Sequence, residues 1–96
     1  MIKFKDDEEG YLAWVAANPA GFVVNVDIHA RYPQYPMVHR ATHKLISSPA
    51  RTNYTSNEYI KWCSTDLHEL EMMAVQSYAR ALNRCATCMG SPLHRR

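Results

Sequence analysis

Two short segments of the chain alternate along their length in the pattern of β-strands. In residues 22–28 every second residue, beginning with Phe22, is apolar. Residues 59–63 place Ile60 and Trp62 on one side and Lys61 on the other. Residues 37–40 can form a further short strand. These segments therefore predict three strands, which we expect to pair as an antiparallel sheet.

An N-terminal helix is predicted before the first of these strands. Asp6 or Asp7 can cap it, because a carboxylate accepts hydrogen bonds from the first backbone amides of a helix. Leu12 and Val15 lie three residues apart and would share its buried face. The helix should end before Pro19, which disfavours a helical residue in front of it.

A longer helix is predicted after the last strand, with Ser64 or Thr65 as its cap. Its acidic residues come early and Arg80 and Arg84 come late, as the helix dipole favours. Apolar residues recur in it at spacings of three and four, at Leu67, Leu70, Ala74, Tyr78 and Ala81.

These elements predict an α+β fold. We expect a small three-stranded antiparallel sheet packed on the long C-terminal helix, with an N-terminal helix and a cysteine-containing knuckle at the end. With 96 residues the chain fits one domain. We assign 1–90 to this domain and 91–96 to a basic tail. The expected core lies between the sheet and the long helix and contains Phe22, Val24, Ile60, Trp62, Leu70, Ala74 and Tyr78.

Composition narrows the class of protein. Hydrophobic residues make up 47% of the chain, as in ordinary globular domains. The apolar runs are far shorter than the ~20 residues of a membrane span, and the acidic N-terminus does not resemble a secretory signal. Three cysteines without such a signal predict reduced thiols in the cytoplasm. The chain has no phosphate-binding glycine motif, and we expect no enzymatic activity.

Two short-spaced pairs of metal-binding residues stand out. Cys85 and Cys88 are separated by two residues, and His39 and His43 by three. Two such pairs are the usual ligands of tetrahedral zinc, so we predict a Zn²⁺ bound in a knuckle, with Cys63 as a competing ligand. Four protein ligands would make the site structural. A redox-active dithiol and thiols without metal are the alternatives.

Basic residues dominate the middle of the chain, where no acid occurs between Asp27 and Glu58. Arginine and tyrosine together suit phosphate contact and base stacking, and we predict a nucleic-acid-binding segment there. Its candidate residues are Arg31, Tyr32, Tyr35, Arg40, Lys44 and Arg51. The same composition is typical of protein interfaces, so a protein-interaction module, an inhibitor or adaptor, is the alternative function.

Residues 38–46, 58–64 and 85–88 resemble an uncharacterised bacterial domain. That domain has a His-Arg-Ala-x-Cys segment, a Tyr-Ile-Lys-Val-Cys segment and a terminal Cys-x-x-Cys, and sometimes lies beside nuclease-type domains. The resemblance covers most of the chain from Gly21 to Cys88 and implies a small zinc-binding domain. His43 stands where the pattern has Cys.

The spacing of the ligands is also distantly similar to that of the metal-binding domain of the Ada DNA-repair protein. The methyl transfer performed by that domain needs a nucleophilic cysteine in the first ligand pair. His39 and His43 cannot supply it, so this activity is not expected of the chain.

Overall fold

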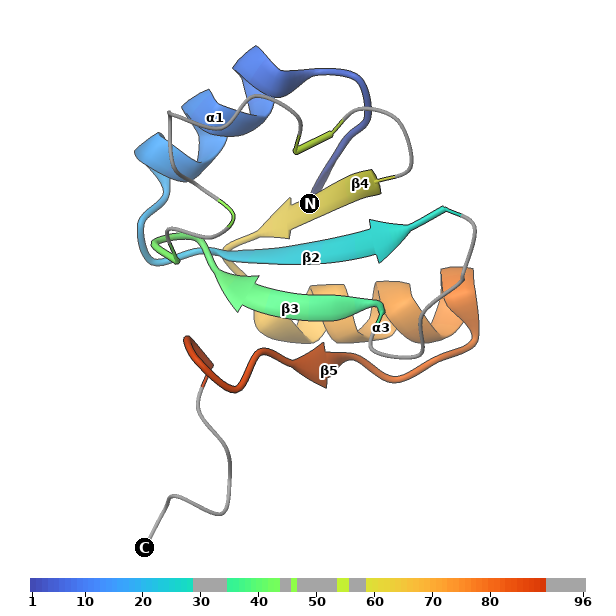
Figure 1. The fold of residues 1–96 in the computed structure, drawn as a ribbon. Coiled ribbons are helices and arrows are strands. Elements are labelled where there is room, and N and C mark those ends of the chain that lie inside the picture. Colours follow the sequence, from blue (N-terminus) through green and yellow to red (C-terminus); the bar gives the residue numbers. More distant parts are fainter. Residues whose placement is uncertain (29–34, 44–45, 47–53, 56–58, 90–96) are drawn as a thin grey trace, which may run out of the picture.

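The fold is built around a five-stranded sheet with the strand order β1-β4-β2-β3-β5 (Figure 1). The computed structural model describes residues 1–28, 35–43, 46, 54–55 and 59–89. The sheet is mixed: β5 runs parallel to β3, whereas all other neighbours are antiparallel. The predicted three-stranded antiparallel sheet on one long helix is therefore wrong.

The three central strands are the predicted ones. They are β2 (Phe22–Asp27), β3 (Met37–Arg40) and β4 (Tyr59–Ser64). β2 lies between the other two, so that Val23 is paired with His39 on one side and with Cys63 on the other. Paired residues point to the same face of a sheet, which puts these three side chains in one row.

The two outer strands were missed. They are β1 (Ile2–Phe4), next to β4, and β5 (Asn83–Arg84), next to β3. Strands this short contain too few residues to show an alternating pattern. Tertiary pairing defines them instead: the Asn83 amide donates to the Pro36 carbonyl and the Cys85 amide to the Val38 carbonyl, each at 3.0 Å.

The helices begin close to the predicted positions. α1 (Glu8–Ala17) is capped by Asp7, whose carboxylate accepts the Gly10 amide at 2.9 Å, and it ends at Asn18 as expected. α3 (Leu67–Tyr78) is capped by Asp66 and not by Ser64 or Thr65. It also ends early, because Ala79 takes a left-handed conformation with φ 55°. Residues beyond it turn back along the sheet, so Arg80 and Arg84 are not in the helix.

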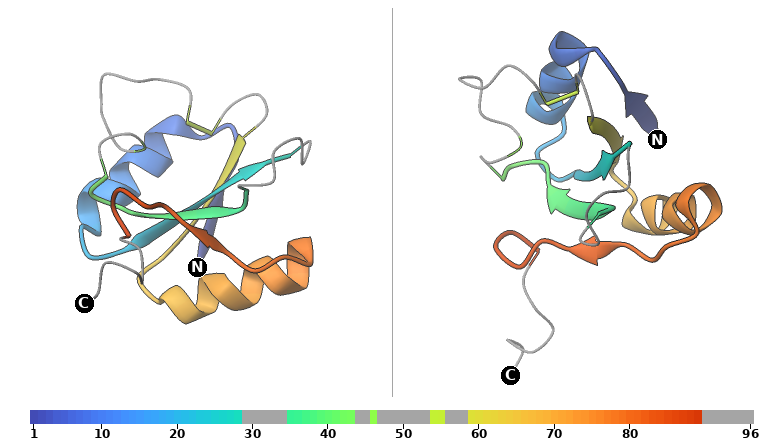
Figure 2. Two further views of the ribbon diagram at one scale, coloured as in Figure 1. Left: turned by 60° about the horizontal axis from the view of Figure 1, so that its bottom comes forward. Right: turned by 45° about the vertical axis from the view of Figure 1, so that its right-hand side comes forward.

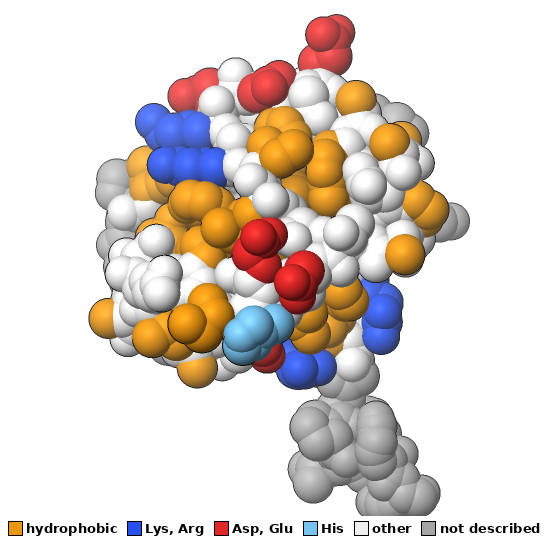
Figure 3. Space-filling view, turned by 180° about the vertical axis from the view of Figure 1, so that it is seen from behind, with side chains coloured by type: hydrophobic (Ala, Val, Ile, Leu, Met, Phe, Trp, Pro, Cys, Tyr) orange, Lys and Arg blue, Asp and Glu red, His pale blue; other side chains and the backbone are white. Residues whose placement is uncertain are grey.

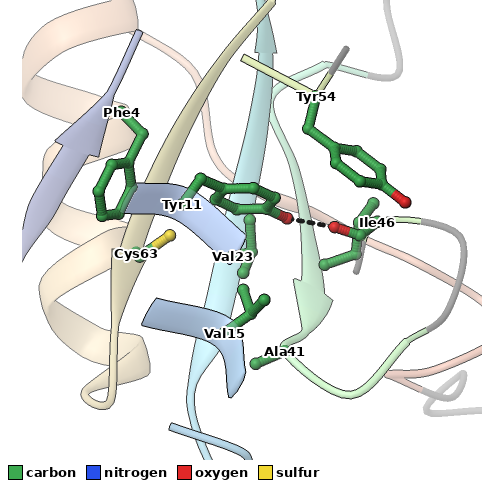
Figure 4. Close-up of a cluster of buried hydrophobic side chains, with 8 residues drawn as sticks. All are labelled: Phe4, Tyr11, Val15, Val23, Ala41, Ile46, Tyr54 and Cys63. Carbon is green, nitrogen blue, oxygen red and sulfur yellow. Dashed lines mark hydrogen bonds between the residues drawn. The ribbon is translucent and has the colours of Figure 1, made fainter. Parts of the chain in front are cut away.

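α1 covers one face of the sheet, the face to which Val23 points (Figures 1 and 2). The Tyr11 hydroxyl donates to the carbonyl of Ile46, which ties the helix to the segment after β3 (Figure 4). We call the buried residues on this side the α1 cluster. Its members are Phe4, Tyr11, Val15, Val23, Ala41, Ile46, Tyr54 and Cys63.

α3 covers the opposite face, to which the next residue of β2, Val24, points. This α3 cluster contains the buried residues Val24, Val26, Val38, Ile60, Leu70 and Met73, with Phe22, Trp62 and Tyr78 partly buried against it. The predicted core is thus confirmed, and Ala74 is also buried. What the sequence did not indicate is a second core of similar size on the other face.

The described residues include no helix with the length and apolar character needed to cross a membrane.

Candidate metal centre

Two segments far apart in the sequence meet at the β3 edge of the sheet. His39 lies on β3, is buried, and points to the α1 face. β3 ends at Arg40, and the chain turns so that the His43 amide donates to the Arg40 carbonyl at 3.0 Å. This turn brings the second histidine back beside the first, with the ring centroids 5.5 Å apart.

The cysteine pair comes from the segment that follows β5. Cys85 follows β5 directly. Its backbone amide donates a hydrogen bond to the Val38 carbonyl, which places Cys85 beside β3. The next residues form a turn closed by a hydrogen bond from the Met89 amide to the Cys85 carbonyl at 2.9 Å. We call residues 85–89 the knuckle. Its turn brings Cys88 toward His39.

The four candidate ligand atoms, one each from His39, His43, Cys85 and Cys88, all lie within 4.8 Å of one another. The two Nδ1 atoms are 3.4 Å apart, and the Nδ1–Sγ distances are 3.8 Å for His43–Cys85 and 3.9 Å for His39–Cys88. Tetrahedral zinc, with bonds of about 2.0–2.1 Å to nitrogen and about 2.3 Å to sulfur, separates two nitrogens by about 3.3 Å and nitrogen from sulfur by about 3.6 Å. The donor set and its spacing therefore fit a tetrahedral metal ion.

The histidine environment favours the neutral imidazole that binds metal. Burial, followed by the neighbouring His43 and Lys61, lowers the pKa of His39 to about 4. At neutral pH the His39 ring is therefore uncharged and has a nitrogen lone pair available.

The two thiols of the knuckle differ in acidity. Burial acts to raise the pKa of Cys85, but hydrogen bonds from the backbone amides of Cys88 and Thr87 outweigh it and leave the pKa lowered. For Cys88, burial and the neighbouring Cys85 raise the pKa, although the Arg40 amide donates to its sulfur at 3.3 Å. Amides directed at sulfur stabilise the thiolate, the form that binds a metal.

Cys63, the competing ligand proposed from the sequence, lies apart from this group. β2 separates it from His39, because Val23 is paired with both residues. Its side chain is fully buried in the α1 cluster, where burial raises the pKa of the thiol to about 12.

Two of the predicted nucleic-acid-binding residues lie in the described part of the chain. The ring of Tyr35 packs against that of Tyr59, with centroids 6.0 Å apart. The backbone amide and the guanidinium of Arg40 both contact Cys88. Each residue thus has intramolecular contacts, although Arg40 is exposed. The other four, Arg31, Tyr32, Lys44 and Arg51, fall outside the described residues.

Comparison of the chain with protein-family models, with curated proteins and with solved structures gave no match.

Proposed function

We propose that the chain is a small binding module stabilised by a structural zinc ion. The observation that carries the proposal is the convergence of four donor atoms, one from each of His39, His43, Cys85 and Cys88, within 4.8 Å of one another. Nitrogen and thiolate ligands together are the set that zinc prefers, and four protein ligands leave no position for a substrate or water. The site is therefore suited to holding the fold together and not to catalysis. The reduced thiols it needs agree with the cytoplasmic location expected from the sequence.

The zinc would cross-link two distant parts of the chain, since the knuckle lies 42 residues beyond His43. Metal binding that requires the knuckle to lie against β3 adds its free energy to that arrangement, on the order of 10 kcal/mol for structural zinc.

Protein purified under reducing conditions should contain one zinc ion per chain by elemental analysis and native mass spectrometry. The variants His43→Ala and Cys88→Ser should lose it, because each removes a ligand. Cys63→Ser is the matched control and should keep its zinc, since this thiol lies across β2 from the site. Wild-type protein that neither carries zinc nor takes it up when Zn²⁺ is added would refute the proposal.

For the binding activity, we propose nucleic acid as the partner. Support comes from the interval without acids between Asp27 and Glu58, in which Arg31, Lys44 and Arg51 lie close to the metal ligands in sequence. Zinc would fix one part of this interval in place, and a fixed basic surface loses less entropy on contact with phosphate.

Binding to DNA or RNA should be detectable by fluorescence anisotropy at low salt with a dissociation constant of about micromolar, and should weaken as salt rises. Changing Arg31 and Arg51 to Glu should abolish it. Arg40 is unsuitable for this test because it contacts the knuckle. Absence of binding to single- and double-stranded DNA and RNA at low salt would eliminate the proposal.

A protein partner is the second candidate, favoured by the outer surface of α3. Met72 and Val75 lie three residues apart there and are 45% and 55% exposed. Figure 3 shows hydrophobic side chains in patches between charged groups on the face opposite to that of Figure 1. An apolar interface would respond little to salt, which separates this candidate from nucleic-acid binding.

A further inference from the structure

Arg40 touches both halves of the candidate metal centre. Its carbonyl accepts the amide of His43 at 3.0 Å, which closes the turn between the two histidines. Its amide donates to Cys88 Sγ at 3.3 Å, and its side-chain Nε donates to the Cys88 carbonyl at 2.9 Å. The guanidinium carbon also lies 5.8 Å from the centre of the Phe22 ring.

We propose that Arg40 is a positioning residue of the metal centre. Its guanidinium would hold the Cys88 end of the knuckle against the end of β3, so that the Cys88 sulfur stays within reach of a metal bound by the histidines. The inference rests on the proposed zinc site and adds to it a residue that binds no metal itself.

The knuckle is attached to the fold by several contacts, one of which is the packing of Met89 against the α3 cluster. β5 has only two residues. The last backbone–backbone hydrogen bond between this segment and β3 is the one from the Cys85 amide to the Val38 carbonyl. Cys88 lies three residues beyond that bond. The two Arg40 contacts join Cys88 itself to β3, and the Phe22 ring restricts where the guanidinium can lie.

Arg40 is suited to this role by geometry as well as by charge. Nε–H of arginine donates in a fixed direction within a planar group, whereas the ammonium of lysine is a compact charge on a flexible stem. Residues that orient metal ligands without binding the metal typically change its affinity by about 10- to 100-fold when they are replaced.

The test compares wild-type protein with Arg40→Gln and Arg40→Lys. Arg80→Gln is a matched control, because the Arg80 guanidinium also donates to a backbone carbonyl, that of Tyr35 at 3.1 Å, but contacts no ligand residue. Zinc affinity is measured by competition with a chelator. Cobalt is then substituted for zinc, since the absorption of Co²⁺ reports its coordination geometry and its bonds to sulfur.

We expect both Arg40 variants to bind zinc about 10-fold more weakly or worse and to show an altered cobalt–sulfur absorption band. Arg80→Gln should leave that band unchanged even if it destabilises the fold. Arg40→Lys keeps the positive charge. If Arg40→Gln does not fold, the zinc affinity and cobalt spectrum of Arg40→Lys still test the inference.

Two results would overturn the inference while the zinc site stands: unchanged affinity and cobalt spectrum in Arg40→Gln, or full affinity and an unchanged spectrum in Arg40→Lys. The second result would mean that charge alone suffices. Wild-type protein that binds neither metal would instead overturn the zinc site, and the role of Arg40 with it.

Discussion

Residues of the same type lie in different surroundings in this fold, as the three cysteines show. Cys63 is fully buried among apolar side chains of the α1 cluster. Cys88 is partly exposed, and its sulfur accepts the amide of Arg40. Because only the thiolate is an effective nucleophile, these surroundings decide how each thiol reacts.

Cys63 should therefore resist alkylation in the native protein. Its buried thiol has a pKa raised to about 12, so almost no thiolate forms near neutral pH. With iodoacetamide and mass spectrometry, metal-free native protein should be modified at Cys85 and Cys88 only, and denaturant should add Cys63. The variant Cys63→Ser checks the assignment of that third modification. Native labelling of Cys63 as fast as that of Cys88 would show that the α1 cluster opens readily.

Among the elements, β5 and the knuckle are the ones that the proposed metal would cross-link most directly to β3. β2 is hydrogen-bonded to β3 and β4 on either side, whereas β5 is a two-residue strand at the edge of the sheet. The proposed metal adds cross-links from the knuckle to β3 and to the turn after it. The backbone hydrogen bonds that join this segment to β3 and to the residue before it include those of the Cys85 and Asn83 amides, each at 3.0 Å.

Removing the metal should thus loosen this segment before the rest of the sheet. In hydrogen–deuterium exchange, the amides of Cys85 and Met89 should lose protection when zinc is chelated, while those of β2 and β4 remain protected. Cys88→Ser should give the same pattern without a chelator. If protection fell equally in β2 and β4, the metal would be stabilising the whole fold and not one edge.

At the scale of the whole molecule, the sheet separates two hydrophobic clusters. α1 and the Tyr54 segment cover one face, and α3 covers the other (Figure 2). The candidate metal centre lies beside the end of β3 on the α1 side, because His39 shares a face with Val23 and Cys63. The α3 cluster lies on the opposite face, and Met89 of the knuckle packs against it.

The sequence by itself determined the elements and ligand pairs that depend on neighbouring residues. Alternation located β2 and β4, residues 37–40 were expected as a further short strand, and Asp6 or Asp7 marked the start of α1. The spacing of His39–His43 and Cys85–Cys88 indicated a common site, since each pair is held by its own short turn. Facing side chains of strands and helices likewise identified half of the buried residues of the α3 cluster, namely Val24, Ile60 and Leu70.

Tertiary structure alone decided what depends on residues distant in the sequence. β1 and β5 are too short to have a pattern and exist as strands through their pairing with β4 and β3. Lys61 is buried because Asn25 and the Tyr54 carbonyl bind its ammonium group. Cys63 could be separated from the other cysteines only once β2 was known to lie between it and His39. A long-range contact leaves no periodic signal in the chain, because its two partners are brought together only when the sheet forms.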